Sequence, residues 1–200
     1  MGQLSKLDAV NRMLRAASEL PVNSIDESQV SDTGVALSVL NEVNIKFQLE
    51  GRTWNTEIMT ITPNASGNIV IGSDVLAIRP ANDWYYKEFY PRGGKMYDAE
   101  NNTFDFSTNY SDGVEFQVVS LIGFEDAPTE AQMYIVSMAE REYQARLIGD
   151  RDVDSNLAEY EARAQIRSRR EEAKTRKGRW ISTISPLGRR IHDRRNDYFN

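Results

Sequence analysis

The residue types that most often carry out chemistry in proteins are scarce in this chain. It contains no cysteine and one histidine, His192, so a zinc–thiolate site, a cysteine nucleophile and a disulfide framework are excluded. No Ser–His–Asp set surrounds His192 in the sequence, and an isolated histidine of this kind is typical of a protein surface. The sequence therefore predicts no catalytic residue, no metal site and no bound cofactor.

Sequence patterns that bind phosphate or calcium are missing as well. Neither a GxxxxGKS/T loop nor a GxGxxG loop occurs, and a hairpin turn is expected at Arg92, Gly93 and Gly94. Carboxylates are plentiful, and a glycoside hydrolase needs only two of them, but the sequence singles out no pair. Four acidic residues are candidates for calcium ligands, but they do not have the D-x-D-x-D-G spacing of a calcium loop: Asp105, Asp112, Glu125 and Asp126.

Charge is divided unevenly along the chain. Residues 1–160 hold 12 Lys+Arg and 25 Asp+Glu, a net charge of −13, whereas residues 161–200 hold 12 and 5, a net charge of +7. The acidic body should repel DNA, and the basic end suggests a segment that binds a partner through its charge. The basic run at 167–179 could contact nucleic acid, but its interleaved Glu171 and Glu172 favour a solvated helix end.

Two helices are predicted before residue 53. Residues 7–17 follow Ser5, whose N-cap position and spacing to Asp8 indicate a capping box. Residues 33–50 show the three- and four-residue apolar spacing of one helical face and end at Gly51.

Two further helices are predicted after residue 126. Residues 130–148 follow a capping box of Thr129 and Gln132, and their first half is apolar nearly all round, so other helices should surround it. Residues 153–177 have a thin apolar content. This last helix is therefore expected to be exposed along much of its length or completed by a neighbouring subunit.

The section between these helix pairs predicts β structure. Turn-forming residues recur roughly every ten positions, which favours an antiparallel sheet or a small barrel. The aromatic run at 84–90 is expected to form sheet core and cross-strand pairs, with an exposed patch for a protein partner as the alternative. The predicted strands span residues 57–62, 68–71, 75–79, 84–90, 95–98, 103–106 and 114–122.

The predicted fold class is α+β. Residues 1–53 and 126–177 would form an antiparallel four-helix bundle, and residues 54–125 an antiparallel β-sheet or barrel-like domain inserted between the second and third helices. Residues 178–200 would form an extended basic tail. The N-terminus lacks the apolar run of a signal peptide, and no segment predicts a membrane span.

The junction between the second helix and the first strand carries polar residues close to the apolar helix face. Asn41, Asn44 and Gln48 lie three or four positions apart, and Gly51 and Trp54 mark the change from helix to strand. The amides could form a solvated flank. Alternatively, they hydrogen-bond the chain that turns back at Gly51, and we favour this second interpretation.

The C-terminal tail mixes isolated apolar residues with paired arginines. A free tail has little use for such apolar side chains, whereas a segment that folds on a partner uses them as anchors. The predicted docking residues are Trp180, Ile184, Leu187, Arg189, Arg190 and Ile191.

Several colinear segments resemble one protein family. They are Val10–Leu14, Leu20–Ile25, positions within Leu40–Glu57, Arg92–Asp98 and Pro128–Ala139. In order and spacing, over roughly residues 7–150, the chain is similar to the tail tubular protein A family of short-tailed bacteriophages. Members of this family are adaptor or gatekeeper rings between the head and the tail.

The resemblance implies a structural virion protein of the tail, assembled in the host cytoplasm and not an enzyme. It implies a dodecameric ring of this chain between the portal protein and the tail nozzle protein, with no membrane contact. Genomic DNA would pass through the ring without specific binding. The basic tail would embrace the portal, and the β insertion, with the turn at Arg92, Gly93 and Gly94, would face the nozzle.

Two other functions are weighed against this adaptor. A nucleic-acid-binding module would use residues 163–195 and would show salt-dependent binding to duplex DNA. A tail-associated polysaccharide hydrolase is motivated only by the carboxylates of the β region.

Overall fold

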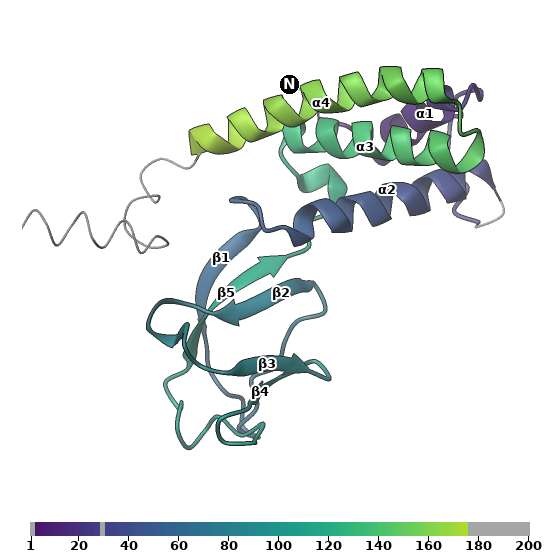
Figure 1. Cartoon of the computed structure of the whole chain (residues 1–200). Coiled ribbons are helices and arrows are strands. Elements are labelled where there is room, and N and C mark those ends of the chain that lie inside the picture. Colours follow the sequence, from purple (N-terminus) through teal and green to yellow (C-terminus); the bar gives the residue numbers. More distant parts are fainter. Residues whose placement is uncertain (1–2, 29–30, 176–200) are drawn as a thin grey trace, which may run out of the picture.

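Helices gather at one end of the molecule, and two small antiparallel sheets project from them (Figure 1). The structure is a computed structural model that describes residues 3–28 and 31–175. The predicted α+β class is confirmed, as are the first three predicted helices to within one residue at each end. The helices are α1 (Lys6–Ala16), α2 (Asp32–Leu49), α3 (Thr129–Leu147) and α4 (Arg151–Thr175).

Local capping chemistry explains where α1 begins but not where α3 begins. Ser5 Oγ accepts a hydrogen bond from the Asp8 N–H at 3.1 Å, and the Asp8 carboxylate accepts one from the Ser5 N–H at 3.2 Å. The predicted capping box of α3 is wrong, because Pro128 occupies the N-cap position and no side chain caps the helix. Gln132 is turned to tertiary contacts instead: its amide accepts from the Leu4 N–H at 3.0 Å and donates to the Phe124 carbonyl at 2.9 Å.

Helix α3 lies at the centre of the helical layer and packs against α1, α2 and α4. Its apolar first half is buried, with Ile135, Val136 and Ala139 each at 0% exposure. This confirms the prediction that other helices surround it. The cluster extends through α1 and α2 and includes Val10, Met13, Leu14, Val39, Leu40, Phe47 and Tyr143.

Ion pairs and side-chain hydrogen bonds link helix α4 to α3. Arg141 of α3 pairs with Asp154 at 2.6 Å and with Glu161 at 3.3 Å, and the hydrogen bond from Arg141 lowers the pKa of Asp154. Gln165 donates to the Tyr134 hydroxyl at 2.8 Å. Within the described part of α4, Ser168 alone is buried, so this helix contributes little to the apolar core.

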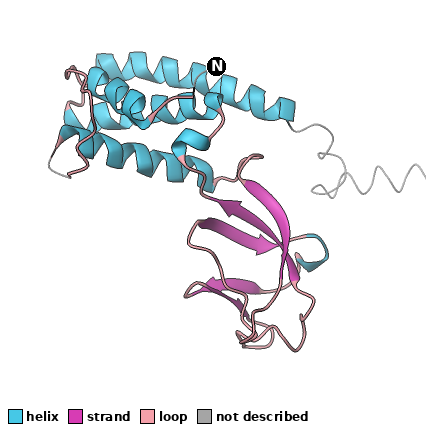
Figure 2. Cartoon of the chain, turned by 180° about the vertical axis from the view of Figure 1, so that it is seen from behind, coloured by secondary structure: helices cyan, strands magenta, loops and turns pink. Residues whose placement is uncertain are grey.

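The β segment contains two separate antiparallel sheets (Figure 2). The first has the order β1-β5-β2, with Met59 opposite Phe116 and Ile78 opposite Val118. The second is the β3-β4 hairpin. No closed barrel forms among residues 3–28 and 31–175, so the barrel-like alternative is not observed. The strands are β1 (Thr56–Ile61), β2 (Val75–Pro80), β3 (Phe89–Arg92), β4 (Lys95–Asp98) and β5 (Val114–Ser120).

A second apolar cluster lies between the two sheets. It is rich in aromatic rings, and Phe89 lies 5.2 Å from Phe106 and 5.3 Å from Tyr110 between ring centroids. Its buried members are Ile69, Phe89, Met96, Phe106, Tyr110, Val114, Phe116 and Val118. The helical layer and the β segment therefore each have an apolar core of their own.

The sequence pattern predicted one strand over the aromatic run at 84–90, and this prediction is wrong. A short 3-10 turn spans Asn82–Trp84, and β3 begins only at Phe89. Asn82, which lies just before the run, has a φ of 51°, outside the extended region. The Trp84 ring turns inward, 5.5 Å from the Tyr110 ring, while Tyr85 and Tyr86 are exposed. Inward packing of one ring therefore overrides the strand preference of the run.

Two other predicted strands shrink to single bridges. Val70 pairs with Lys95, and Thr103 pairs with Asp98. Both short segments lie against β4, so they extend the hairpin without becoming full strands. No helix in the described part of the chain combines the length and apolarity needed to cross a bilayer.

Glu140 is a buried carboxyl group on α3, with 7% of its surface exposed. Its Oε1 lies 2.7 Å from Nε of Arg12 on α1. Burial raises the pKa of Glu140 above its ordinary value of 4.5, although Arg12 opposes this shift. Ionising this carboxyl group in the folded protein therefore costs free energy that the unfolded chain does not lose.

We predict that wild type loses stability relative to Glu140→Gln as the pH rises above 4.5. A carboxyl group with a raised folded-state pKa contributes stability below the unfolded pKa and loses it as the pH rises through the folded pKa. Glutamine does not ionise, so the Tm of wild type minus that of the variant falls between about pH 4 and about pH 7. Thermal unfolding at several pH values measures this, with exposed Glu27→Gln as the control. A difference that does not change with pH contradicts the prediction.

Candidate functional site

The amide of Gln48 joins the end of α2 to the chain that leaves β5. Its Nε2 donates to the Ile122 carbonyl at 2.8 Å, and its Oε1 accepts from the Ile122 N–H at 2.8 Å. The second Nε2 hydrogen is donated to Oδ1 of Asn44, one helical turn earlier, at 2.8 Å. Gln48 is 0% exposed and Asn44 is 6% exposed. One buried amide thus makes the pair of bonds that a neighbouring strand would make.

Asn55 holds the turn between α2 and β1. Its Nδ2 donates to the carbonyls of Gln48 and Ser120, both at 3.1 Å, and its Oδ1 accepts from the Arg52 N–H at 2.6 Å. Gly51 begins this turn with a φ of +75°, a conformation that a side chain would strain. The incoming and outgoing chains of the β segment therefore meet at a single asparagine.

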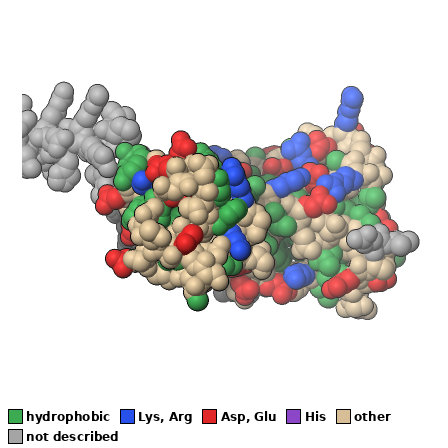
Figure 3. Space-filling view, turned by 90° about the horizontal axis from the view of Figure 1, so that it is seen from below, with side chains coloured by type: hydrophobic (Ala, Val, Ile, Leu, Met, Phe, Trp, Pro, Cys, Tyr) green, Lys and Arg blue, Asp and Glu red, His purple; other side chains and the backbone are tan. Residues whose placement is uncertain are grey.

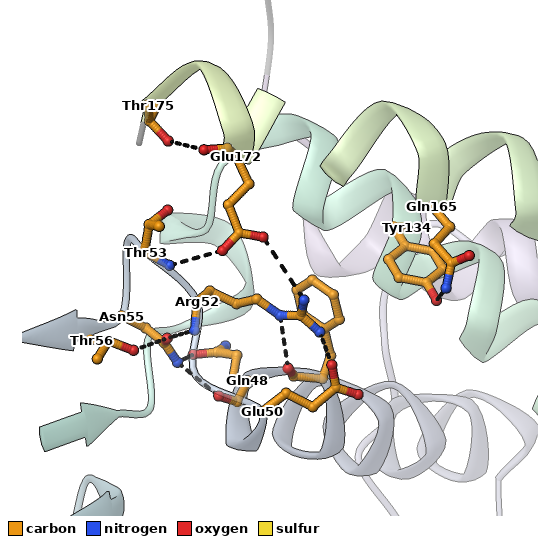
Figure 4. A network of polar contacts seen from close by, with 11 residues as sticks. Gln48, Glu50, Arg52, Thr53, Asn55, Thr56, Tyr134, Gln165, Glu172 and Thr175 are labelled. Carbon is orange, nitrogen blue, oxygen red and sulfur yellow. Dashed lines mark hydrogen bonds and ion pairs between the residues drawn. The ribbon is translucent and has the colours of Figure 1, made fainter. Parts of the chain in front are cut away.

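Arg52 connects the same turn to the end of α4 (Figure 4). Its guanidinium carbon lies 4.0 Å from the centre of the Phe47 ring, and its Nε donates to the Phe47 carbonyl at 3.2 Å. The guanidinium also pairs with Glu50, and it lies 3.9 Å from the carboxylate of Glu172 on α4. Glu172 in addition accepts from the Thr53 N–H at 3.1 Å. These contacts bring α2, the β segment and the last turns of α4 together.

Aromatic packing supports the polar network from the helical side. The Trp54 ring lies 6.5 Å from the Phe47 ring, and Phe47 meets Tyr134 of α3 edge to face at 5.4 Å. Trp54 packs against the helical cluster. Trp54 thus packs on the helical side of the junction, although it lies only two residues before β1.

The structure brings together four of the five predicted junction residues: Asn44, Gln48, Gly51 and Trp54. Asn41 differs, because its side chain is exposed on α2 and takes no part in this network. Sequence reasoning missed the three other residues that complete the junction. Arg52 and Asn55 had a usable signal, since polar residues within a few positions of a helix-ending glycine are candidates for turn bonds. Glu172 had none, because it lies over a hundred residues away. The missed residues are Arg52, Asn55 and Glu172.

The turn predicted to face the nozzle lies at the tip of the β3-β4 hairpin. Gly93 and Gly94 have φ values of +58° and +74°, and a Cβ on either would meet nothing within 4 Å. The Arg92 guanidinium carbon lies 4.0 Å from the centre of the Tyr97 ring. The tip is therefore free to contact a partner. The six predicted docking residues at 180–191 lie outside the described part of the chain.

The polar contacts of the junction hold elements of the fold together. Among residues 3–28 and 31–175, no three His, Asp or Glu side chains are grouped so that they could hold a metal ion. The buried polar side chains at the junction bond to backbone groups or to each other. Hydrophobic side chains reach the surface between charged ones in the view from below (Figure 3).

Comparison with known families gives a match over most of the chain. The model of the family described as Tube, Tail tubular protein, matches residues 7–178. No curated protein matches the chain significantly. The matched residues include both sides of the junction and all of α4, so the match extends beyond residue 150, where the sequence resemblance ended.

We predict that Gln48→Leu lowers the free energy of unfolding by about 2–4 kcal/mol, because it leaves the N–H and C=O groups of Ile122 without their partner. Asn41→Leu is the control on the same helix, and it changes stability by less than about 0.5 kcal/mol because its side chain is exposed. Chemical denaturation of both variants measures the difference. If both variants unfold at the same denaturant concentration, the junction does not depend on Gln48.

Proposed function

The chain belongs to the tail tubular protein family, and from this premise we propose that it forms the adaptor ring between the portal and the tail nozzle. The family places the chain among structural proteins of the bacteriophage virion tail, which assemble with other tail components. The adaptor role, the ring of copies of this chain and both partners are our proposal.

The observation that carries the proposal is the junction itself. An adaptor must present two surfaces to two partners and keep them in one relation to each other. Here the helical layer and the β segment have separate apolar cores. They are tied by the paired bonds of Gln48 to Ile122 and by those of Asn55 to Ser120. Buried bonds of this kind resist bending, because breaking them leaves polar groups unpaired.

The β segment supplies the surface proposed to face the nozzle. On the outer side of the hairpin, Tyr90 and Tyr97 lie opposite each other, and the Tyr97 ring lies 5.0 Å from the Phe104 ring. Tyr90 and Phe104 are exposed by 48% and 40%. Together with Arg92 at the hairpin tip, these rings form a surface of the composition that protein interfaces favour.

The helical layer supplies the ring wall in this proposal, and residues 178–200 supply the portal contact. Residues 1–53 and 126–177 would act as one helical bundle and residues 54–125 as its inserted domain. The last turns of α4 lie at the junction, so the docking tail would begin close to the place where the two parts meet. The net charge of −13 in residues 1–160 suits a channel wall from which DNA is released without sticking.

We predict that mutations can abolish binding at one of the two surfaces without affecting the other. A chain that ends after Thr175 loses portal binding, because the proposed anchor residues are removed, yet it still binds the nozzle protein. Arg92→Glu with Tyr90→Ala shows the opposite result, because it changes only the exposed hairpin. Pull-down and electron microscopy of wild type and both variants with purified portal and nozzle proteins measure this.

Arg79→Glu, on the edge strand β2 and exposed, is a control for the hairpin variant. Wild type that binds neither partner, and forms no ring on the portal, contradicts the proposed function. Loss of both interactions in either variant contradicts the division into two surfaces.

A further inference from the structure

An open groove is lined by residues of α2, α3 and α4. Its volume is about 630 Å³, and its lining comes from the C-terminal half of α2, from α3, from the α3–α4 turn and from α4. Five apolar side chains contribute to the lining: Val43, Phe47, Tyr134, Met138 and Ala145. We call this feature the α2–α4 groove. Its length along the helices suits an elongated occupant such as another helix.

The rim of the α2–α4 groove is acidic. Its lining includes three cationic residues, one of which, Arg141, is already paired with Asp154 and Glu161. The acidic residues of the lining outnumber the cationic ones, and they are Glu50, Glu142, Asp150, Asp154 and Glu161. Two of them, Glu50 and Glu142, pair with Arg52 and Arg146, which lie outside the lining. An apolar lining under an acidic rim favours an apolar helix face that carries cations.

A buried acceptor in the same groove lacks a hydrogen bond. Gln144 lines the groove and is 0% exposed. Its Nε2 donates to the Asp150 carbonyl at 3.1 Å, but its Oε1 accepts from no group in the described residues. Leaving a buried carbonyl oxygen unpaired costs free energy. A donor brought in by an occupant of the groove would remove this cost.

The outward side of α4 has the complementary character. Arg163, Ile166, Arg167 and Arg170 follow the i, i+3, i+4, i+7 spacing of one helical face, and all four are exposed. Ile166 is 58% exposed. Arg163 pairs with Glu159 on its own helix, whereas Arg167 and Arg170 form no ion pair with any described residue. We call these four residues the α4 strip.

We propose that the α4 strip of one copy of this chain docks in the α2–α4 groove of the next copy. Ile166 would meet the apolar lining, the arginines would meet the acidic rim, and one guanidinium could donate to Gln144 Oε1. The groove lies between α4 and α2, while the strip faces away from α3. The contact is therefore head-to-tail, the kind that closes into a ring at a fixed rotation. This inference rests on the proposed ring and names the two faces that build it.

Two variants test the contact separately. Ala145→Lys places a long cation in the groove, at a position that is exposed in the single chain and should tolerate it. Arg167→Glu with Arg170→Glu reverses the charge of the strip. Each variant should weaken self-association of the full chain by at least about tenfold, because both apolar fit and charge are disturbed. Sedimentation and mass photometry at several concentrations measure this.

Matched controls change the same charges elsewhere. Ala65→Lys alters an exposed alanine of the β segment, and Lys6→Glu with Lys95→Glu alters two exposed cations. Both controls should associate as wild type does. Circular dichroism and thermal unfolding of every variant show that the fold is retained.

An equimolar mixture of the groove variant and the strip variant gives the sharpest result. The groove variant keeps an intact strip, and the strip variant keeps an intact groove, so the two should pair once and stop at dimers. Higher salt should weaken the wild-type contact because it screens the charges.

The inference is overturned if the groove and strip variants associate like wild type, or if their mixture assembles beyond dimers. It is also overturned if wild type does not self-associate in solution up to about 100 μM, because even a weak interface would populate dimers at that concentration. None of these results would by itself overturn the adaptor role, which depends on the portal and nozzle complexes.

Discussion

The structure depends on one buried hydrogen-bonded pair, the side-chain amide of Gln48 with the backbone of Ile122. The two residues are 74 positions apart, and the whole β segment lies between them. An amide at 0% exposure must have its bonds satisfied inside the protein. The α2 helix and the chain that leads to α3 are therefore held at one distance, and the β segment leaves and returns to the helical layer at one place.

The other contacts of the junction extend this constraint to the end of the described chain. Arg52 stacks on Phe47 and reaches Glu172 of α4, and Glu172 accepts from the backbone of Thr53. The last turns of α4 are thus fixed to the turn that begins the β segment. A force applied at either end of the molecule would act on the same few buried groups, as the proposed adaptor role requires.

Helix α4 shows how a weak core contact and an assembly role fit together. It binds α3 through ion pairs and amides, and one residue of its described part is buried. Its outward side carries Ile166 and exposed arginines, which a single chain leaves in water. The thin apolar content seen in the sequence is explained if this helix has two neighbours, α3 on one side and another copy on the other.

The sequence by itself determined the helices, the strands β1, β2, β4 and β5 and the absence of cysteine chemistry, because these follow from local spacing, turn residues and composition. It also pointed to Asn44, Gln48 and Gly51 as the junction. Only the tertiary structure decided that Gln132 bonds to Phe124 rather than capping α3, that Trp84 turns inward, and that Glu172 meets Arg52. The physical reason is that a hydrogen bond or ring contact depends on which groups, distant in sequence, the fold brings close together. The periodicity of apolar residues predicts local structure but does not say which distant groups will meet.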